Sequence, residues 1–253
     1  MLKDVNNSYK YQWCVSMKMR LKEIVKKYVP AKLLCLLQKW RQMLWTLWGK
    51  VLFKNQINLR RNAKKSHRYL EIGCGGSRLP EFETLDIVGG PNMDYVYDAA
   101  KPLPFKDNTF DLIYASHVLE HIPWYKTEEV LREWVRILKP GGQLEVWVPD
   151  GLKICQTLLK AELEGINEIE KNGWYKFNPY KDPCVWTSGR IFTYGDGTGN
   201  PNHPNWHRAM FTPRYLKELF ERVGLKDIRE MDRSEVRGYD HGWINLGVKG
   251  TKL

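Results

Sequence analysis

The stretch that decides the fold is residues 68–86, RYLEIGCGGSRLPEFETLD. It opens with a short, mainly apolar run, YLEI, and then breaks at the glycine-rich residues 73–76, GCGG. This pattern predicts a buried parallel strand that ends in a tight glycine turn. A second strand is predicted over residues 83–88, and it carries the carboxylate of Asp86. Because ligands of open parallel sheets bind beyond the carboxyl ends of adjacent strands, the glycine turn and Asp86 are expected to face one crevice.

The spacing between these two features indicates which kind of ligand the crevice takes. The dinucleotide-binding pattern needs a third glycine and a helix N-terminus beneath the pyrophosphate. Here Arg78 occupies the third-glycine position, and only ten residues, Pro80 among them, separate Gly75 from Asp86. A full crossover helix does not fit, so the phosphate site is weakened while a carboxylate suited to a ribose diol is kept. The sequence therefore favours a nucleoside ligand without phosphates.

Four segments together carry a family resemblance. LEIGCGG, LDI, DAAKPLPFKDNTFDLIYASHVLEHIP and ILKPGGQLEVWVPD resemble class I S-adenosylmethionine (SAM)-dependent methyltransferases over roughly residues 67–250. The short link between the first two strands looks like the type 11 subgroup, which often accompanies glycan biosynthesis. The resemblance implies SAM as cofactor and an α/β fold: a Rossmann-like sheet of seven strands that ends in an antiparallel hairpin.

The remaining pattern agrees with one methyltransferase domain over residues 67–253. An insertion at 151–210 interrupts the alternation of strands and helices, and we expect it to be a substrate lid because it lies at the ligand edge and is rich in aromatic residues. It is predicted to hold a helix over 152–163 and an irregular segment over 172–206. The other predicted strands are 93–97, 110–115, 143–148, 225–231 and 243–248, and helices are predicted from Thr127 to the KPGG at 139–142 and from Thr212 to Gly224.

Residues 1–66 are expected to form a basic helical extension. They hold 16 Lys and Arg against Asp4 and Glu23, whereas the rest of the chain holds 24 basic and 27 acidic residues. Apolar residues from Leu33 to Val51 follow the helical period, with basic residues interspersed that argue against a membrane span. This face suits packing on the core, contact with a second subunit, or an anionic membrane surface. Nucleic acid is an unlikely partner because the domain outside the extension is net acidic.

The cysteines and the N-terminus suggest the compartment. The five cysteines form no CxxC pair, so the sequence predicts neither a disulfide framework nor a zinc–cysteine site. No secretory signal pattern precedes the first apolar cluster. We expect a cytoplasmic protein, with peripheral association at the inner membrane surface as the variant that the extension allows.

The resemblance assigns the cofactor residues by position. Gly73, Cys74 and Gly75, which follow the first strand, would lie under the methionine part of SAM. Glu71 would hold the amino end of SAM, and Asp86 would bind the ribose hydroxyls. Later positions would border the adenine and close the pocket. The predicted cofactor residues are Glu71, Gly73, Cys74, Gly75, Asp86, Asp98, Ala99 and Ser116.

Methyl transfer to an oxygen requires removal of a proton, so a general base is expected near the acceptor. The candidates are His117, His121 and the strand-end Asp150, while a structural role for His121 with Glu120 stays open. The helical spacing of HVLEH (117–121) would also allow a divalent metal, but the motif offers no further carboxylate and no metal is expected. Predicted acceptor-binding residues on the lid are Trp186, Tyr194, His203, His207 and Arg208.

The leading hypothesis is O-methylation of a sugar in a polysaccharide, a glycolipid or a nucleotide-sugar precursor. The Trp, Tyr, Asn and His residues of the lid suit stacking and hydrogen bonding with a polyol. One alternative is an O- or N-methyltransferase of a small molecule or of a quinone-like or lipid acceptor. Another is a protein that binds SAM or a partner without catalysis.

Overall fold

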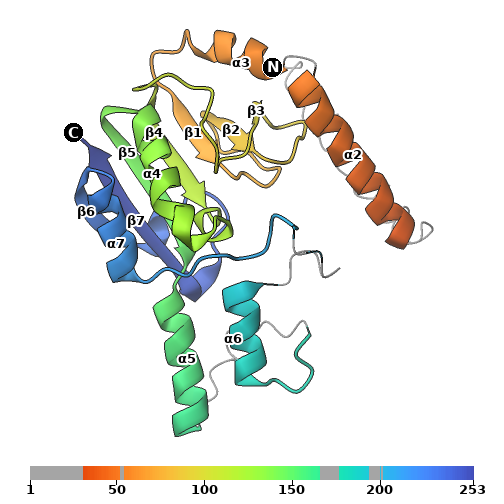
Figure 1. Ribbon diagram of the computed structural model, residues 1–253, viewed down its shortest axis with the longest axis vertical. Coiled ribbons are helices and arrows are strands. Elements are labelled where there is room, and N and C mark those ends of the chain that lie inside the picture. The colour runs from red at the N-terminus through yellow and green to blue at the C-terminus, as the bar shows by residue number, and fades with distance from the viewer. Residues whose placement is uncertain (1–30, 52–53, 166–176, 194–199, 201) are drawn as a thin grey trace, which may run out of the picture. The chain divides into compact units, whose positions relative to one another are not determined.

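The computed structural model describes residues 31–51, 54–165, 177–193, 200 and 202–253. The chain forms two compact units, Met1–Trp45 and Thr46–Leu253. In the described part of the first unit the chain is helical, within α2 (Ala31–Val51). The second unit contains the sheet and its covering helices (Figure 1). Among the described helices, none is both long and apolar enough to cross a bilayer.

Seven strands form one sheet in the order β3-β2-β1-β4-β5-β7-β6, and β7 runs antiparallel to both of its neighbours. The chain order reverses between β1 and β4, so the carboxyl ends of these adjacent strands flank the crevice typical of open α/β sheets. The predicted C-terminal hairpin is confirmed. The strands are β1 (Tyr69–Ile72), β2 (Phe82–Asp86), β3 (Tyr95–Val96), β4 (Phe110–Ser116), β5 (Leu138–Pro149), β6 (Leu225–Met231) and β7 (Asn245–Lys252).

Helices α4 (Thr127–Ile137) and α7 (Pro213–Arg222) pack against the sheet. The apolar face of α4 is buried, with Leu131 and Trp134 fully inaccessible. Thr212 accepts a hydrogen bond from the amide of Tyr215 and caps α7, as its sequence predicts. Short 3-10 helices are η1 (Leu119–His121), η2 (Trp124–Lys126), η3 (Arg233–Glu235) and η4 (Gly242–Ile244).

Helix α3 (Lys54–Asn62) is joined to the sheet by asparagine side chains. Asn55 and Asn58 donate to the carbonyl oxygens of Val96 and Asp94 at 3.1 and 2.8 Å. The sequence analysis grouped this segment with the extension that ends at residue 66. The structure instead packs α3 on the edge strand β3, because amide side chains satisfy backbone groups that the edge leaves open.

The insertion is more regular than its composition suggests. Its first part is helix α5 (Gly151–Glu164), as predicted, but a second helix, α6 (Pro183–Phe192), lies within the segment expected to be irregular. Asp182 caps α6 and Pro183 is at its first turn, a start signal that the aromatic and glycine content obscured. Helices α5 and α6 lie side by side (Figure 1). Trp186 of α6 packs on Ile154 of α5.

Candidate active site

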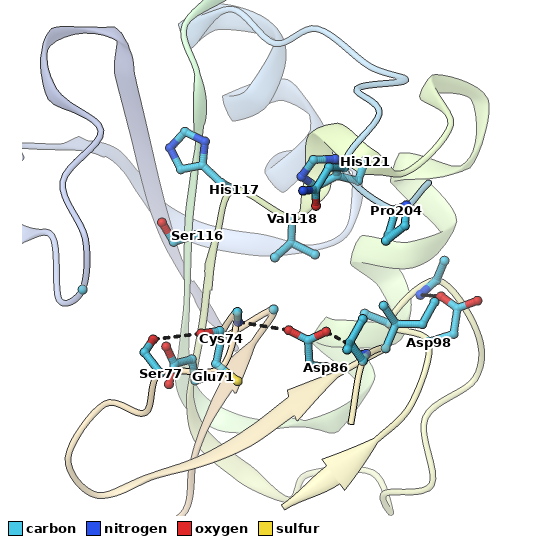
Figure 2. A pocket seen from close by; sticks show the side chains of 18 of the residues that line it. Glu71, Cys74, Ser77, Asp86, Asp98, Ser116, His117, Val118, His121 and Pro204 are labelled. Atoms are coloured by element: carbon cyan, nitrogen blue, oxygen red, sulfur yellow. Dashed lines mark hydrogen bonds between the residues drawn. The ribbon is translucent and has the colours of Figure 1, made fainter. Parts of the chain in front are cut away.

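A cavity of about 750 Å³ lies at the carboxyl ends of the parallel strands. Figure 2 shows Glu71, Cys74 and Asp86 along one wall, with Ser116, His117 and His121 along the opposite one. All eight predicted cofactor residues line this cavity, although they come from four separate segments of the chain. They are Glu71, Gly73, Cys74, Gly75, Asp86, Asp98, Ala99 and Ser116.

The glycine turn after β1 brings the backbone against the turn after β4. Gly73 has φ +73°, a conformation that favours glycine, and its amide donates to the carbonyl of Leu85 at 2.8 Å. A Cβ at Gly73 would lie 2.1 Å from Cγ2 of Val118. The absence of a side chain at Gly73 therefore keeps the floor of the cavity open.

Two carboxylates, Glu71 of β1 and Asp86 of β2, line one wall of the cavity. Asp86 accepts hydrogen bonds from the amides of Gly75 at 3.0 Å and Val88 at 2.9 Å, one on each oxygen. These bonds fix the carboxylate and leave each oxygen a further lone pair. Glu71 accepts from the amide of Leu79 at 2.9 Å, and burial raises its pKa above the usual value.

Cys74 lies in the same wall but is not a nucleophile. Burial, helped by the nearby charge of Asp86, raises the pKa of its thiol to about 12. The thiolate is the reactive form of cysteine, so at neutral pH this side chain acts as a small apolar group beside Met93.

These features fit the cofactor that the sequence resemblance implies. SAM carries a ribose diol and an amino acid end but no phosphates. Fixed acceptors at Asp86 and Glu71 match the first two groups, and the open turn at Gly73 lets the ligand approach the backbone. When bound, SAM supplies a methyl group on a positively charged sulfur.

His117, at the end of β4, is held by oxygen atoms on both ring nitrogens. Its Nδ1 lies 3.0 Å from Oε1 of Glu120, and its Nε2 lies 2.9 Å from Oδ1 of Asn245. Nδ2 of Asn245 donates to Asp240 at 2.7 Å, which fixes the amide so that its oxygen faces the histidine. An imidazolium ring, which carries an N–H on each nitrogen, would suit both of these oxygen atoms.

The electrostatics agree with that protonation state. Burial disfavours charge on His117, but Glu120 and Asn245 outweigh it and the pKa of His117 is raised. The same pairing lowers the pKa of the fully buried Glu120 to about 2, against the opposing effect of burial. His241 stacks on His117 with ring centroids 3.7 Å apart, and burial together with that neighbouring cation lowers the pKa of His241 to about 4.

His121 and His207 differ from His117 in that one ring nitrogen of each contacts a backbone carbonyl. Nδ1 of His121 lies 3.2 Å from the carbonyl oxygen of Trp206, and Nδ1 of His207 lies 3.1 Å from that of Arg190. A carbonyl can only accept, so each Nδ1 carries a proton, and in the neutral form of each ring Nε2 keeps a lone pair. Both residues line a second cavity of about 380 Å³, which shares His117, His121, Asn205 and His241 with the first.

The structure does not bring every predicted catalytic and acceptor-binding residue to these cavities. Asp150 is 3% exposed, lines neither cavity, and accepts from the amides of Leu152 and Lys153 as the cap of α5. Trp186 is fully buried against Ile154, and His203 lies outside both linings. Arg208 and His207 do line a cavity, and Tyr194 lies outside the described residues.

Several lining residues escaped the sequence analysis. They come from two loops: Asn202, Pro204 and Asn205 from the insertion, and Gly238, Tyr239 and His241 from the segment before β7. The second loop could have been found from topology. Because β7 is antiparallel to β5, with Asn245 opposite Pro149, the start of β7 lies at the carboxyl edge of the sheet.

Comparisons with known proteins agree with this architecture. Residues 81–146 match the family described as a methyltransferase domain. A demethylmenaquinone methyltransferase of Bacillus pumilus is 30% identical over 149 residues, which cover 58% of this chain and 55% of that protein. Its counterpart in Listeria monocytogenes is 45% identical over 145 residues, covering 56% and 52% respectively. The chain spans about half the length of these curated relatives.

Among solved structures, a SAM-dependent methyltransferase of Thermotoga maritima, described as a possible histamine N-methyltransferase, is 19% identical to this chain. The match covers 86% of this chain and 96% of that one, with a TM-score of 0.41. The matched domain, the curated relatives and the sheet order with its antiparallel seventh strand support one assignment. By these similarities the chain resembles the class I SAM-dependent methyltransferases.

Proposed function

We propose that this protein transfers the methyl group of SAM to a hydroxyl group of a polar acceptor, with a sugar as the leading substrate class. The observation that carries this proposal is the lining of the cavity beyond the cofactor residues. It offers hydrogen-bonding side chains from several directions, His121, Asn202, Asn205, Arg208 and Tyr239. Such a lining suits a polyol, whose hydroxyl groups each need a partner when they leave water.

The reaction needs alignment and the removal of one proton. The methyl carbon leaves the sulfur as it bonds to the acceptor oxygen, the sulfur keeps the electron pair, and a neutral thioether is released. The hydroxyl proton leaves toward the histidine cluster. In their neutral forms His121 and His207 hold lone pairs on Nε2, whereas the raised pKa of His117 favours a positive charge on its ring.

Transfer of a labelled methyl group from SAM into fractionated cell extract tests the proposal. With the wild-type enzyme we expect label in a glycan, glycolipid or nucleotide-sugar fraction. The label should be lost with Asp86→Ala, because this variant lacks the carboxylate that accepts hydrogen bonds from the ribose hydroxyls. Binding of S-adenosylhomocysteine should be weaker in that variant by more than about tenfold, equivalent to about 1.4 kcal/mol. Label found only in another fraction would overturn the sugar class while keeping the enzyme.

A quinone-type acceptor is the second candidate. It is favoured by the names of the curated relatives, which are demethylmenaquinone methyltransferases. A direct assay with a short-chain demethylmenaquinone separates the two, because a sugar enzyme leaves that compound unmethylated. Cofactor binding without transfer to any fraction would favour a binding protein over an enzyme.

We also propose that α2 attaches the protein to an anionic membrane surface. Leu33, Leu36, Leu37, Trp40, Leu44 and Leu47 follow the helical period along one face, and each is between 47% and 59% exposed. Basic residues are interspersed along the same helix, and residues 1–66 as a whole carry 16 basic against two acidic side chains. An apolar stripe on a strongly basic segment suits an interface of anionic headgroups over acyl chains.

Sedimentation with vesicles tests this attachment. We expect binding to phosphatidylglycerol-containing vesicles and not to pure phosphatidylcholine, with loss of binding in the double variant Trp40→Ala/Leu44→Ala. Leu159→Ala is the matched control, because Leu159 is 54% exposed on α5. A dimer in solution that the double variant dissociates, with no vesicle binding by the wild type, would identify the face as a subunit contact instead.

A further inference from the structure

Three side chains beside the acceptor cavity have the composition of a metal site. Glu120, His121 and His207 each offer one ligand atom, and these atoms lie within 4.8 Å of one another. All three line the cavity of about 380 Å³ that opens beside the acceptor site. Glu120 and His121 belong to η1, and the backbone holds His207 next to them, since the carbonyl of Glu120 accepts from the amides of Arg208 and Ala209 at 2.7 and 3.1 Å.

Both histidines are oriented as metal ligands usually are. A ligating histidine donates its other ring N–H to a carbonyl or carboxylate, which fixes the tautomer and the ring plane. Nδ1 of His121 and Nδ1 of His207 each face a backbone carbonyl, so both Nε2 lone pairs are available. The two rings meet edge to face, with centroids 5.0 Å apart.

The carboxylate supplies a second, independent indication. Glu120 is 1% exposed, and its Oε1 lies 3.0 Å from Nδ1 of His117. Among the described residues, no donor forms a hydrogen bond with Oε2, which is itself inaccessible to solvent. A buried carboxylate oxygen without a partner is costly unless something binds it.

We propose that Glu120, His121 and His207 bind one divalent transition-metal ion, Zn²⁺ or an ion of similar ligand preference. Two imidazoles and one carboxylate form the ligand set of catalytic sites that keep an open coordination position. Magnesium and calcium prefer oxygen ligands and are poor occupants. The inference rests on the proposed function for its role: the open position would bind the acceptor hydroxyl and lower its pKa, so that it could lose its proton to solvent water. His121 and His207 would then act as ligands instead of proton acceptors.

Binding of Zn²⁺ to the metal-stripped full-length protein tests the site directly. Titration calorimetry and elemental analysis should give one ion per chain, with Mg²⁺ giving no heat under the same conditions. His207→Ala should weaken zinc binding by more than about tenfold, since even residues that only support metal ligands are worth 10–100-fold. His67→Ala is the control, because His67 is an exposed histidine far from the cluster in sequence and should leave zinc binding unchanged.

S-adenosylhomocysteine binding reports whether each variant is folded. Equal zinc binding by wild type and His207→Ala, or no stoichiometric binding by the wild type, would overturn the metal site. Zinc binding is measured without a methyl acceptor, so the metal site and the proposed methyltransferase function can be refuted independently of each other. Methyl transfer by the metal-stripped enzyme would refute a catalytic role of the metal and leave the proposed methyltransferase function standing. Zinc binding without any methyl transfer would support the metal site and refute the proposed function.

Discussion

The side-chain oxygen of Asn245 lies 2.9 Å from Nε2 of His117, and Asp240 holds the amide in that orientation through a bond of 2.7 Å to Nδ2. Asn245, the first residue of β7, thus helps to favour the protonated form of His117, which follows β4. His117 has φ +54°, a strained conformation for a residue other than glycine. Glu120 and Asn245 together raise the pKa of His117 and so favour a positive charge beside the cavity.

Replacing Asn245 by alanine should therefore impair both stability and turnover. The N–H of His117 would lose its buried acceptor, which costs roughly 1–3 kcal/mol of unfolding free energy. We expect kcat to fall while the affinity for S-adenosylhomocysteine is unchanged, because Asn245 does not line the cofactor cavity. Urea denaturation, calorimetry and steady-state kinetics measure the three quantities. Unchanged turnover in a destabilised variant would restrict Asn245 to a structural role.

The two glycines of the turn after β1 provide a matched pair for the cofactor site. Gly73 and Gly75 have φ +73° and +58°, so alanine is strained at either position by about 1 kcal/mol or more. Only at Gly73 would the new Cβ collide, at 2.1 Å from the stiff side chain of Val118, whereas nothing lies within 4 Å at Gly75. Gly73→Ala should therefore lower the melting temperature and the affinity for S-adenosylhomocysteine much more than Gly75→Ala. Equal effects would show that strain alone decides the cost.

The sequence predicts which side chains gather at the carboxyl edge of the sheet, because local chemistry determines their positions. Glycine turns, strand-end carboxylates and their spacing lie within short segments, and a parallel sheet brings their ends together by topology. All eight cofactor positions accordingly line one cavity, with Asp86 fixed against Gly75.

The rest of the cavity depends on contacts between distant segments, which the periodicity of the sequence does not record. His207 lies beside His121 because the backbone of Glu120 pairs with residues 208 and 209, more than eighty positions away. Tyr239 and His241 reach the cavity only because β7 reverses direction. Trp186 and Asp150 were predicted to belong to the site, but the structure places them elsewhere. Their residue types suggested substrate binding and catalysis, but one fills the α5–α6 contact and the other caps α5.

Tyr239 offers a test of the loop before β7. It lines the cavity, is 78% exposed, and contacts His241 edge to face with centroids 4.8 Å apart. We expect Tyr239→Ala to raise the KM for the acceptor several-fold while leaving cofactor affinity and melting temperature unchanged. Tyr180→Ala is the control, since Tyr180 is 92% exposed and lies outside the cavity lining. An unaltered acceptor KM would exclude Tyr239 from acceptor binding.

The buried pair of Arg68 and Glu83 makes stability depend on pH. Arg68 donates two hydrogen bonds of 2.8 Å to the two oxygens of Glu83, and Tyr95 adds a third of 2.6 Å. Burial alone would raise the pKa of Glu83, but these bonds outweigh it and the pKa is lowered from 4.5. A carboxylate with a lower pKa in the folded state stabilises the fold above its unfolded-state pKa. That contribution is lost as the pH falls below about 4.5 and through the folded-state pKa.

Glu83→Gln should therefore cost about 3–5 kcal/mol of unfolding free energy at pH 7, because it leaves Arg68 buried without its charge partner. The variant should also lose part of the acid sensitivity, so that its unfolding free energy falls less steeply than that of the wild type below pH 4.5. Glu128→Gln is the control. It removes two exposed pairs, with Arg132 on α4 and Arg222 on α7, each of a kind worth at most roughly 1 kcal/mol, and should keep the wild-type acid profile. Parallel pH profiles for wild type and Glu83→Gln would mean that other carboxylates govern acid unfolding, and that the charge of Glu83 is not what stabilises this edge of the sheet.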